Sequence, residues 1–107
     1  MAHPPASDPI LQRFRAAVVD KYGDRVARMV LYGSRARGDA RPDSDYDIAI
    51  FLHDPASFWA EMGPLSEIET EILCDTGAVI SAKPFPVEAY MSRTAFMGEV
   101  RRDGLDL

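Results

Sequence analysis

Cysteine is nearly absent from this sequence: Cys74 is the only one in 107 residues. A single thiol excludes an intrachain disulfide and a metal site built from cysteines, and we expect Cys74 to be buried as a small apolar side chain. The chain also lacks any apolar run near the ~18 residues that are needed to span a membrane. Residues 1–7 lack the basic and apolar regions of a signal peptide. These absences predict a soluble cytoplasmic protein that does not associate with membranes.

Positive charge is also in deficit, because the formal net charge is −5. Tight binding to DNA or RNA depends on Lys and Arg contacts to phosphates, so we expect no direct DNA binding. A nucleotide held through a metal ion remains compatible with this charge. The length and a hydrophobic content of 47% predict one small domain, residues 8–107, behind a disordered lead of residues 1–7.

The chain is predicted to begin with a helix followed by a strand. Asp8-Pro9 combines a helix N-cap with a proline at the first helical position, and apolar residues follow at every fourth position. This helix should end near Tyr22, before Gly23. Residues 25–32 form the first predicted strand, which is apolar on both faces near its end, as buried strands are.

Alternation in that strand places Val26 on the same face as Val30 and Tyr32. Residues 34–37 are predicted to form one short helical turn. Residues 45–52 are then predicted to form a second buried strand. The connection of about a dozen residues permits either parallel or antiparallel pairing of the two strands.

The second half of the chain is predicted to contain two more helices around a third strand. Asp54-Pro55 repeats the cap-and-proline signal, and Gly63-Pro64 should break or kink the helix that follows. Residues 78–82 form the third predicted strand. Pro84 and Pro86 confine its far end to a sheet edge or an exit from the sheet.

The predicted fold class is α/β (α+β), with a small mixed sheet of about three strands flanked by helices. From Val87 the chain is predicted to be helical again, with residues 104–107 as a tail. Phe58, Trp59 and Met62 are expected in the core. An exposed apolar patch for a partner is the alternative for these three side chains.

The most informative stretch connects the first two predicted strands. Gly33-Ser34 lies between a strand and a helical turn, where backbone N–H groups and a hydroxyl can face a phosphate. Asp45 and Asp47 lead into the next strand and share a face, roughly 6–7 Å apart. Two carboxylates this close repel each other unless a cation intervenes, and Mg²⁺ prefers one or two carboxylates plus phosphate oxygens. The stretch therefore predicts a metal-dependent nucleotide site.

Ten residues separate Gly33-Ser34 from the pair Asp45-x-Asp47. With its context, Leu-Tyr-Gly-Ser-Arg-Ala-Arg-Gly-Asp and then Ser-Asp-Tyr-Asp-Ile, this spacing resembles the signature of the DNA polymerase β-type nucleotidyltransferase superfamily. It is similar in particular to the small branch called minimal nucleotidyltransferases. The resemblance implies a polymerase β-like nucleotidyltransferase fold.

The resemblance also implies a role for each motif residue. Asp45 and Asp47 would be the catalytic residues and would bind Mg²⁺. ATP or another nucleoside triphosphate would be the substrate. Four residues would bind this nucleotide: Gly33, Ser34, Arg35 and Arg37. For the two arginines, contact with a partner or a solvated turn is the alternative.

Many minimal nucleotidyltransferases are encoded beside a HEPN-domain partner, and some of these pairs are toxin–antitoxin modules. The resemblance thus implies an Mg²⁺-dependent nucleotidyltransferase that acts as antitoxin by transferring AMP from ATP to a hydroxyl of a HEPN-type toxin. The alternative is a catalytically weak or silent antitoxin that neutralises its partner by binding. A fragment of an aminoglycoside-type nucleotidyltransferase is disfavoured, since no second domain is present to hold that substrate. A homo- or hetero-oligomer is left open.

The chain departs from the superfamily pattern at the third predicted strand. The superfamily usually has a third carboxylate there, which helps to bind a second metal ion and activates the attacking hydroxyl. Here Ser81 is the expected occupant of that position, and residues 78–82 contain no acid. Either Asp75 or Glu88 reaches the site, or a partner supplies an acid, or the activity is weak or lost.

Overall fold

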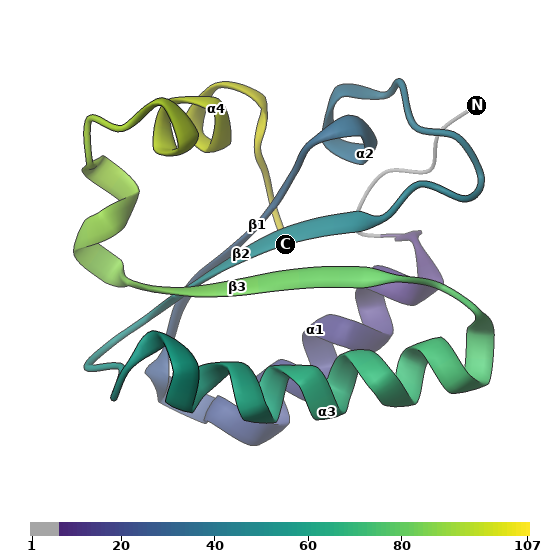
Figure 1. The fold of residues 1–107 in the computed structure, drawn as a ribbon, viewed down its shortest axis with the longest axis horizontal. Helices are drawn as coiled ribbons and strands as arrows, with labels where there is room; N and C mark the ends of the chain where they lie inside the picture. The colour runs from purple at the N-terminus through teal and green to yellow at the C-terminus, as the bar shows by residue number, and fades with distance from the viewer. Residues whose placement is uncertain (1–6) are drawn as a thin grey trace.

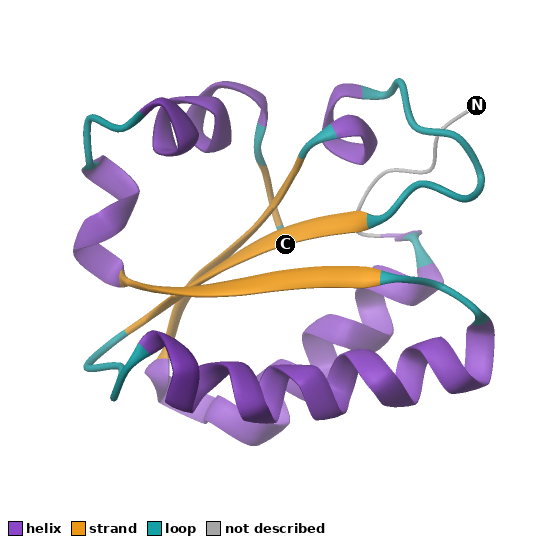
Figure 2. Ribbon diagram, in the orientation of Figure 1, coloured by secondary structure: helices purple, strands orange, loops and turns teal. Residues whose placement is uncertain are grey.

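The computed structural model describes residues 7–107, so the predicted lead, residues 1–7, lies almost entirely outside the described part of the chain. In chain order the elements are α1 (Pro9–Tyr22), the 3₁₀ helix η2 (Gly23–Arg25), β1 (Val26–Tyr32), α2 (Ser34–Arg37), β2 (Tyr46–Leu52), α3 (Phe58–Thr76), β3 (Ile80–Pro86), the 3₁₀ helix η3 (Val87–Met91), α4 (Ala95–Asp103) and β4 (Leu105–Asp106). The strands form one sheet in the order β3-β2-β1-β4, with helices on both faces (Figures 1 and 2). β1 is antiparallel to β2 and β4, whereas β2 is parallel to β3. This mixed sheet confirms the predicted fold class.

α1 begins and ends where the sequence predicts. The Asp8 side chain accepts hydrogen bonds from the backbone N–H groups of Ile10 (2.8 Å) and Leu11 (3.3 Å), and so caps the helix. Gly23 ends α1 with a φ of 56°, a conformation that glycine adopts without strain. The side chains that α1 buries are Leu11, Phe14, Val18 and Tyr22.

β1 and β2 form the centre of the sheet, and their register places Tyr32 opposite Asp47. The register shifts between Val26 and Arg28. An irregularity of this kind turns the residues beyond it toward the opposite face. Val26 therefore packs in the core beneath α1 and α3, away from the face that holds Tyr32, and its predicted face is wrong.

β3 begins later and ends later than the predicted strand of residues 78–82, and it runs through both prolines. A proline cannot donate a hydrogen bond to a neighbouring strand, and β3 tolerates two of them because it lies at the edge of the sheet. The backbone N–H of Ala82 lies near the Glu69 carboxylate of α3 and lowers its pKa. Because Pro84 and Pro86 have no N–H, this edge offers few donors to an additional strand.

α3 begins at Phe58 with Ser57 as its N-cap, so Asp54-Pro55 does not start the helix. The helix then continues unbroken to Thr76, and the predicted break at Gly63-Pro64 does not occur. A proline removes one hydrogen bond to the preceding turn. The exposed first turn of α3 lets water satisfy the carbonyl that is left free.

The two faces of the sheet have separate cores. α1 and α3 cover the lower face in Figure 1, and α4 with η3 covers the upper face. β2 alternates between the cores as predicted, with Ile48, Ile50 and Leu52 toward α1 and α3. Ala49 and Phe51 face α4 and η3. Asp47 shares the alternation of these two residues, and its carboxylate therefore lies on the α4 side of the sheet.

Several apolar side chains are placed differently from the sequence prediction. Cys74 is exposed on α3. Trp59 is 80% exposed and Phe58 is 42% exposed, because they precede the first buried turn of α3 and project away from the sheet. The predicted tail forms a fourth strand, β4, against β1. In the described part of the chain, no helix combines the length and the apolar character needed to cross a membrane.

Glu69→Gln is expected to raise the free energy of unfolding at neutral pH by roughly 0.5–1 kcal/mol. Burial raises the pKa of Glu69 above its ordinary value of 4.5, although the Ala82 N–H and the charge of Lys83 lower it. Its Oε1 is buried without a hydrogen-bond partner in the described structure. A raised pKa in the folded state means that stability falls as the pH rises from about 4.5 through that pKa.

Glutamine keeps an oxygen for the Ala82 N–H and removes the buried charge. Urea unfolding at several pH values measures the effect, with exposed Glu71→Gln on the same helix as the matched control. A loss of stability in Glu69→Gln across the pH range would contradict this account of the carboxylate.

Candidate active site

Gly33 and Asp47, from the two ends of the motif, lie in contact. β1 ends at Tyr32, which pairs with Asp47, so the next residue comes up beside the carboxylate. A Cβ on Gly33 would lie 2.5 Å from Asp47 Oδ2. Gly33 also has a φ of 77° and a ψ of −158°, a region open essentially to glycine alone. The structure thus brings these two predicted site residues together.

α2 starts immediately after Gly33, as predicted. The Gly33 carbonyl accepts hydrogen bonds from the backbone N–H groups of Ala36 and Arg37, both at 3.1 Å. The first N–H groups of a helix, here from Ser34 onward, have no partner inside the helix and carry partial positive charge. They lie at the end of β1, next to the residue that contacts Asp47. At this place they can donate hydrogen bonds to a phosphate.

Arg35 holds the loop that leads to the aspartates. Its guanidinium donates to the carbonyls of Ser44 (2.9 Å) and Pro42 (3.1 Å), and it lies 3.9 Å from the centre of the Tyr46 ring. The predicted phosphate contact of Arg35 stays a prediction, because in this structure its donors are used inside the protein. Its evident effect is to position the loop that carries Asp45.

Asp45 and Arg37 lie at the open rim of the site. Asp45 is exposed and immediately precedes β2, on the same side as Asp47. The Arg37 guanidinium lies 3.4 Å from a carboxylate oxygen of Asp39 and 3.5 Å from one of Glu99. The acids paired with Arg37 are thus Asp39 and Glu99, and not the nearby Asp43.

Burial and two neighbouring acids disfavour the charged form of the Asp47 carboxylate. Burial raises the pKa of Asp47 above its ordinary value, and the charges of Asp45 and Glu99 raise it further. Lys83 and Arg37 act in the opposite direction but do not restore the ordinary pKa. A bound cation would favour the charged form of Asp47 and lower its pKa.

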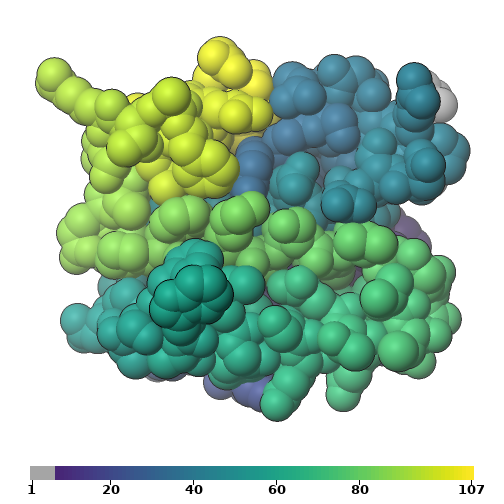
Figure 3. Space-filling view, in the orientation of Figure 1, coloured from purple at the N-terminus to yellow at the C-terminus, as the bar shows by residue number. Residues whose placement is uncertain are grey.

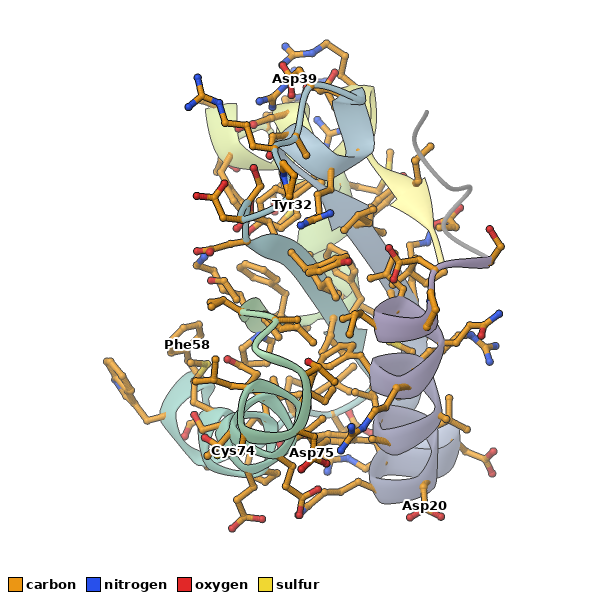
Figure 4. The ribbon with its side chains drawn as sticks, turned by 90° about the vertical axis from the view of Figure 1, so that its right-hand side faces the viewer. Asp20, Tyr32, Asp39, Phe58, Cys74 and Asp75 are labelled. Carbon is orange, nitrogen blue, oxygen red and sulfur yellow. The ribbon has the colours of Figure 1, made fainter. Side chains whose placement is uncertain are left out.

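The third acid does not come from the predicted residues. Ser81 is the partner of Asp47 in β3, as expected from the sequence. Asp75 is ion-paired to an arginine of α1. It lies on the face of the sheet that α1 and α3 cover, away from Tyr32 (Figure 4). Glu88 is exposed in η3 and is not among the charges that act on Asp47. Besides Asp45, the acid whose charge acts on Asp47 is Glu99 of α4.

This geometry agrees with a comparison of the sequence with known families. A family model described as a nucleotidyltransferase domain matches residues 11–97. The chain belongs to the nucleotidyltransferase domain family. The match begins inside α1, includes the whole motif and ends in the first turn of α4. No curated protein is significantly similar to the chain in sequence.

Solved structures share the nucleotidyltransferase fold. A chain from the crystal structure of a toxin–antitoxin with AMP-PNP has a TM-score of 0.61 at 16% identity, over 87% of this chain and 68% of that chain. A chain from the toxin–antitoxin MntA-HpeT, in a mutant with two aspartates changed to glutamate, has a TM-score of 0.60 at 14% identity. That match covers 86% of this chain and 68% of the other. At these identities the likeness shows the fold.

The carboxylates of this nucleotidyltransferase fit one divalent ion. Burial of Asp47, with the charge of Asp45 beside it, disfavours the ionised carboxylate, and a bound cation would offset this. Among residues 7–107, no group of three or more His, Cys, Asp or Glu side chains could hold a metal ion by itself. Mg²⁺ commonly takes one or two carboxylates and completes its shell with water and substrate phosphates. The residues therefore fit Mg²⁺ that binds together with a nucleotide.

Two residues around Asp47 could not be assigned from the sequence. Lys83 reaches the site from β3 and Glu99 from α4, both far from the motif in sequence. The period of two along β3 places Lys83 on the face of Ser81 and Asp47. This alternation could have assigned Lys83 to the site, but only with the correct limits of β3. No comparable local signal exists for Glu99, because the packing of α4 on the sheet sets its position.

Proposed function

We propose that this chain is an Mg²⁺-dependent nucleotidyltransferase that transfers AMP from ATP to a hydroxyl of a HEPN-type toxin and so acts as its antitoxin. The observation that carries the proposal is the contact between Gly33 and Asp47, which joins both ends of the motif at the start of α2. Structures with this fold include a toxin–antitoxin with AMP-PNP, which supports both the nucleotide and the kind of partner.

Each residue of the proposed site has a defined task. Asp45 and Asp47 would hold Mg²⁺, and Gly33 leaves the space that the Asp47 carboxylate needs. The Ser34 hydroxyl and the first N–H groups of α2 would donate hydrogen bonds to the nucleotide phosphates. Arg35 keeps the loop before Asp45 in place. When bound, Mg²⁺ aligns the phosphates and offsets the charge that develops in an in-line displacement.

The direct test is incubation of the chain with its HEPN-type partner, Mg²⁺ and ATP labelled on the α-phosphate. We expect the label to appear on the partner protein, and mass spectrometry should find an added AMP on a hydroxyl side chain. Removal of the divalent ion with EDTA should abolish labelling. Absence of label with every nucleotide and with an intact complex would reject the proposed enzyme.

A second candidate function, neutralisation by binding alone, is favoured by one surface feature. Phe58 and Trp59 form an edge-to-face pair with ring centres 5.3 Å apart, and both are exposed at the start of α3. This turn, teal in Figure 3, lies on the front face of the molecule. An exposed tryptophan is a frequent anchor in protein interfaces. The missing acid on β3 also agrees with a weak or silent enzyme.

Trp59→Ala tests whether this patch binds the toxin. Because the indole is 80% exposed, the change should alter the free energy of unfolding by less than about 0.5 kcal/mol. If the patch binds the toxin, affinity should fall by about 10-fold or more. Calorimetric titration with the toxin measures this, with Met91→Ala as control, since Met91 is 71% exposed on a different element. Unchanged affinity in Trp59→Ala would remove the patch from the interface.

A further inference from the structure

Lys83 is a half-buried cation whose charge acts on the Asp47 and Glu69 carboxylates without a close ion pair to either. Its neighbour on β2 is Ala49, whose small side chain lets the ammonium reach across to β1. There Nζ lies 3.4 Å from the Tyr32 hydroxyl. Within the described residues, no ion pair brings a carboxylate oxygen within 4.0 Å of Nζ. A half-buried ammonium without a close counter-ion is costly unless a ligand supplies the negative charge.

We propose that Lys83 binds a phosphate group of the nucleotide and takes the place of a second metal ion. This inference rests on the proposed function, because it names how the same site holds its substrate. Lys83 follows Ser81 on the face of β3 that adjoins Asp47. A phosphate placed by the first turn of α2 and by an ion on the aspartates would come within reach of an ammonium that already interacts with Asp47.

The charges at the site support this role. A carboxylate with a divalent ion bound has one net positive charge, and a lysine ammonium has the same. Replacing an acid of β3 and its metal ion by Lys83 would therefore leave the charge that faces a triphosphate unchanged. Mg²⁺ commonly takes one or two carboxylates, so the two of this site are enough for one ion. The site would thus work with one metal ion and one lysine.

This arrangement predicts opposite effects on two ligands. With nucleotide present, Lys83 attracts the phosphates, and its loss should weaken binding. With metal ion alone, the ammonium near Asp47 repels a second cation, and its loss should tighten binding. Loss of a residue that only supported the fold would weaken the binding of both ligands or of neither.

The test compares wild type with Lys83→Met, Lys83→Arg and Lys21→Met by titration calorimetry with Mg²⁺–ATP and with Mn²⁺ alone. Lys83→Met should bind Mg²⁺–ATP about 10- to 100-fold more weakly, the range expected for a charged hydrogen bond. It should bind Mn²⁺ alone several-fold more tightly. Lys83→Arg keeps the charge and should stay within about threefold of wild type for the nucleotide. Lys21, ion-paired to Glu67 at 3.0 Å, is the matched control and should change neither ligand.

The outcomes distinguish this inference from the proposed function. If wild type fails to bind Mg²⁺–ATP, the proposed function falls and the role of Lys83 falls with it. If wild type binds Mg²⁺–ATP and Lys83→Met binds it equally well, only the role of Lys83 is overturned. Weaker binding of both ligands in Lys83→Met would also overturn it. Circular dichroism confirms that each variant is folded, and Lys83→Gln, which also removes the charge, replaces Lys83→Met if that variant does not fold.

Discussion

Gly33→Ala is expected to abolish nucleotide transfer and to lower the free energy of unfolding by about 3 kcal/mol, because the new side chain has two separate costs. The new Cβ would lie 2.5 Å from Asp47 Oδ2, so the carboxylate has to move. The backbone at Gly33 has a φ of 77° and a ψ of −158°, a conformation that is also strained for any other residue. The change therefore damages the fold and displaces a proposed metal ligand.

Gly38→Ala is the matched control for the backbone cost. Gly38 ends α2 with a φ of 86°, and a Cβ there would meet nothing within 4 Å. Its replacement should cost only about 1–2 kcal/mol, the usual cost of a left-handed conformation, and should leave transfer intact once the protein is folded. Urea unfolding and the AMP-transfer assay measure the two effects. Equal losses in both variants would show that the contact with Asp47 has no special importance.

Asp47→Asn is expected to lower the rate of AMP transfer by on the order of 10³-fold or more, because an amide is a poor ligand for Mg²⁺. The same change should leave the fold as stable as wild type, or more stable, when no divalent ion is present. Burial is the main reason why the pKa of Asp47 is raised. The ionised form is therefore the less favourable one in the folded protein.

The sign of the pH dependence follows from this shift. A carboxyl group whose pKa is raised by folding destabilises the protein as the pH rises from its ordinary value through the raised one. This part of the pH dependence should disappear in Asp47→Asn, as urea unfolding at several pH values in EDTA would measure. Asp43→Asn, at an exposed turn position, should change neither stability nor transfer. A clear loss of stability in Asp47→Asn would contradict the view that burial disfavours the ionised Asp47 carboxylate.

Local features of the sequence predicted much of the fold. Asp8 and Gly23 mark the two ends of α1, because capping depends on residues that are adjacent in the chain. The alternation of β2 between two cores was also predictable. The failures have physical causes that lie outside local pattern. An irregular register moved Val26 to the other face, and an exposed first turn let α3 continue through Pro64.

The sequence by itself determined the position of the candidate site, because the spacing of Gly33-Ser34 and Asp45-x-Asp47 is a property of the chain alone. Only the tertiary structure decided what surrounds it. The strand pairing places the Asp47 carboxylate against Gly33, and β3 and α4 bring Lys83 and Glu99 to it from distant parts of the sequence. Such contacts depend on strand register and helix packing, which local patterns do not specify. The electrostatic balance of the candidate site is therefore a property of the folded protein.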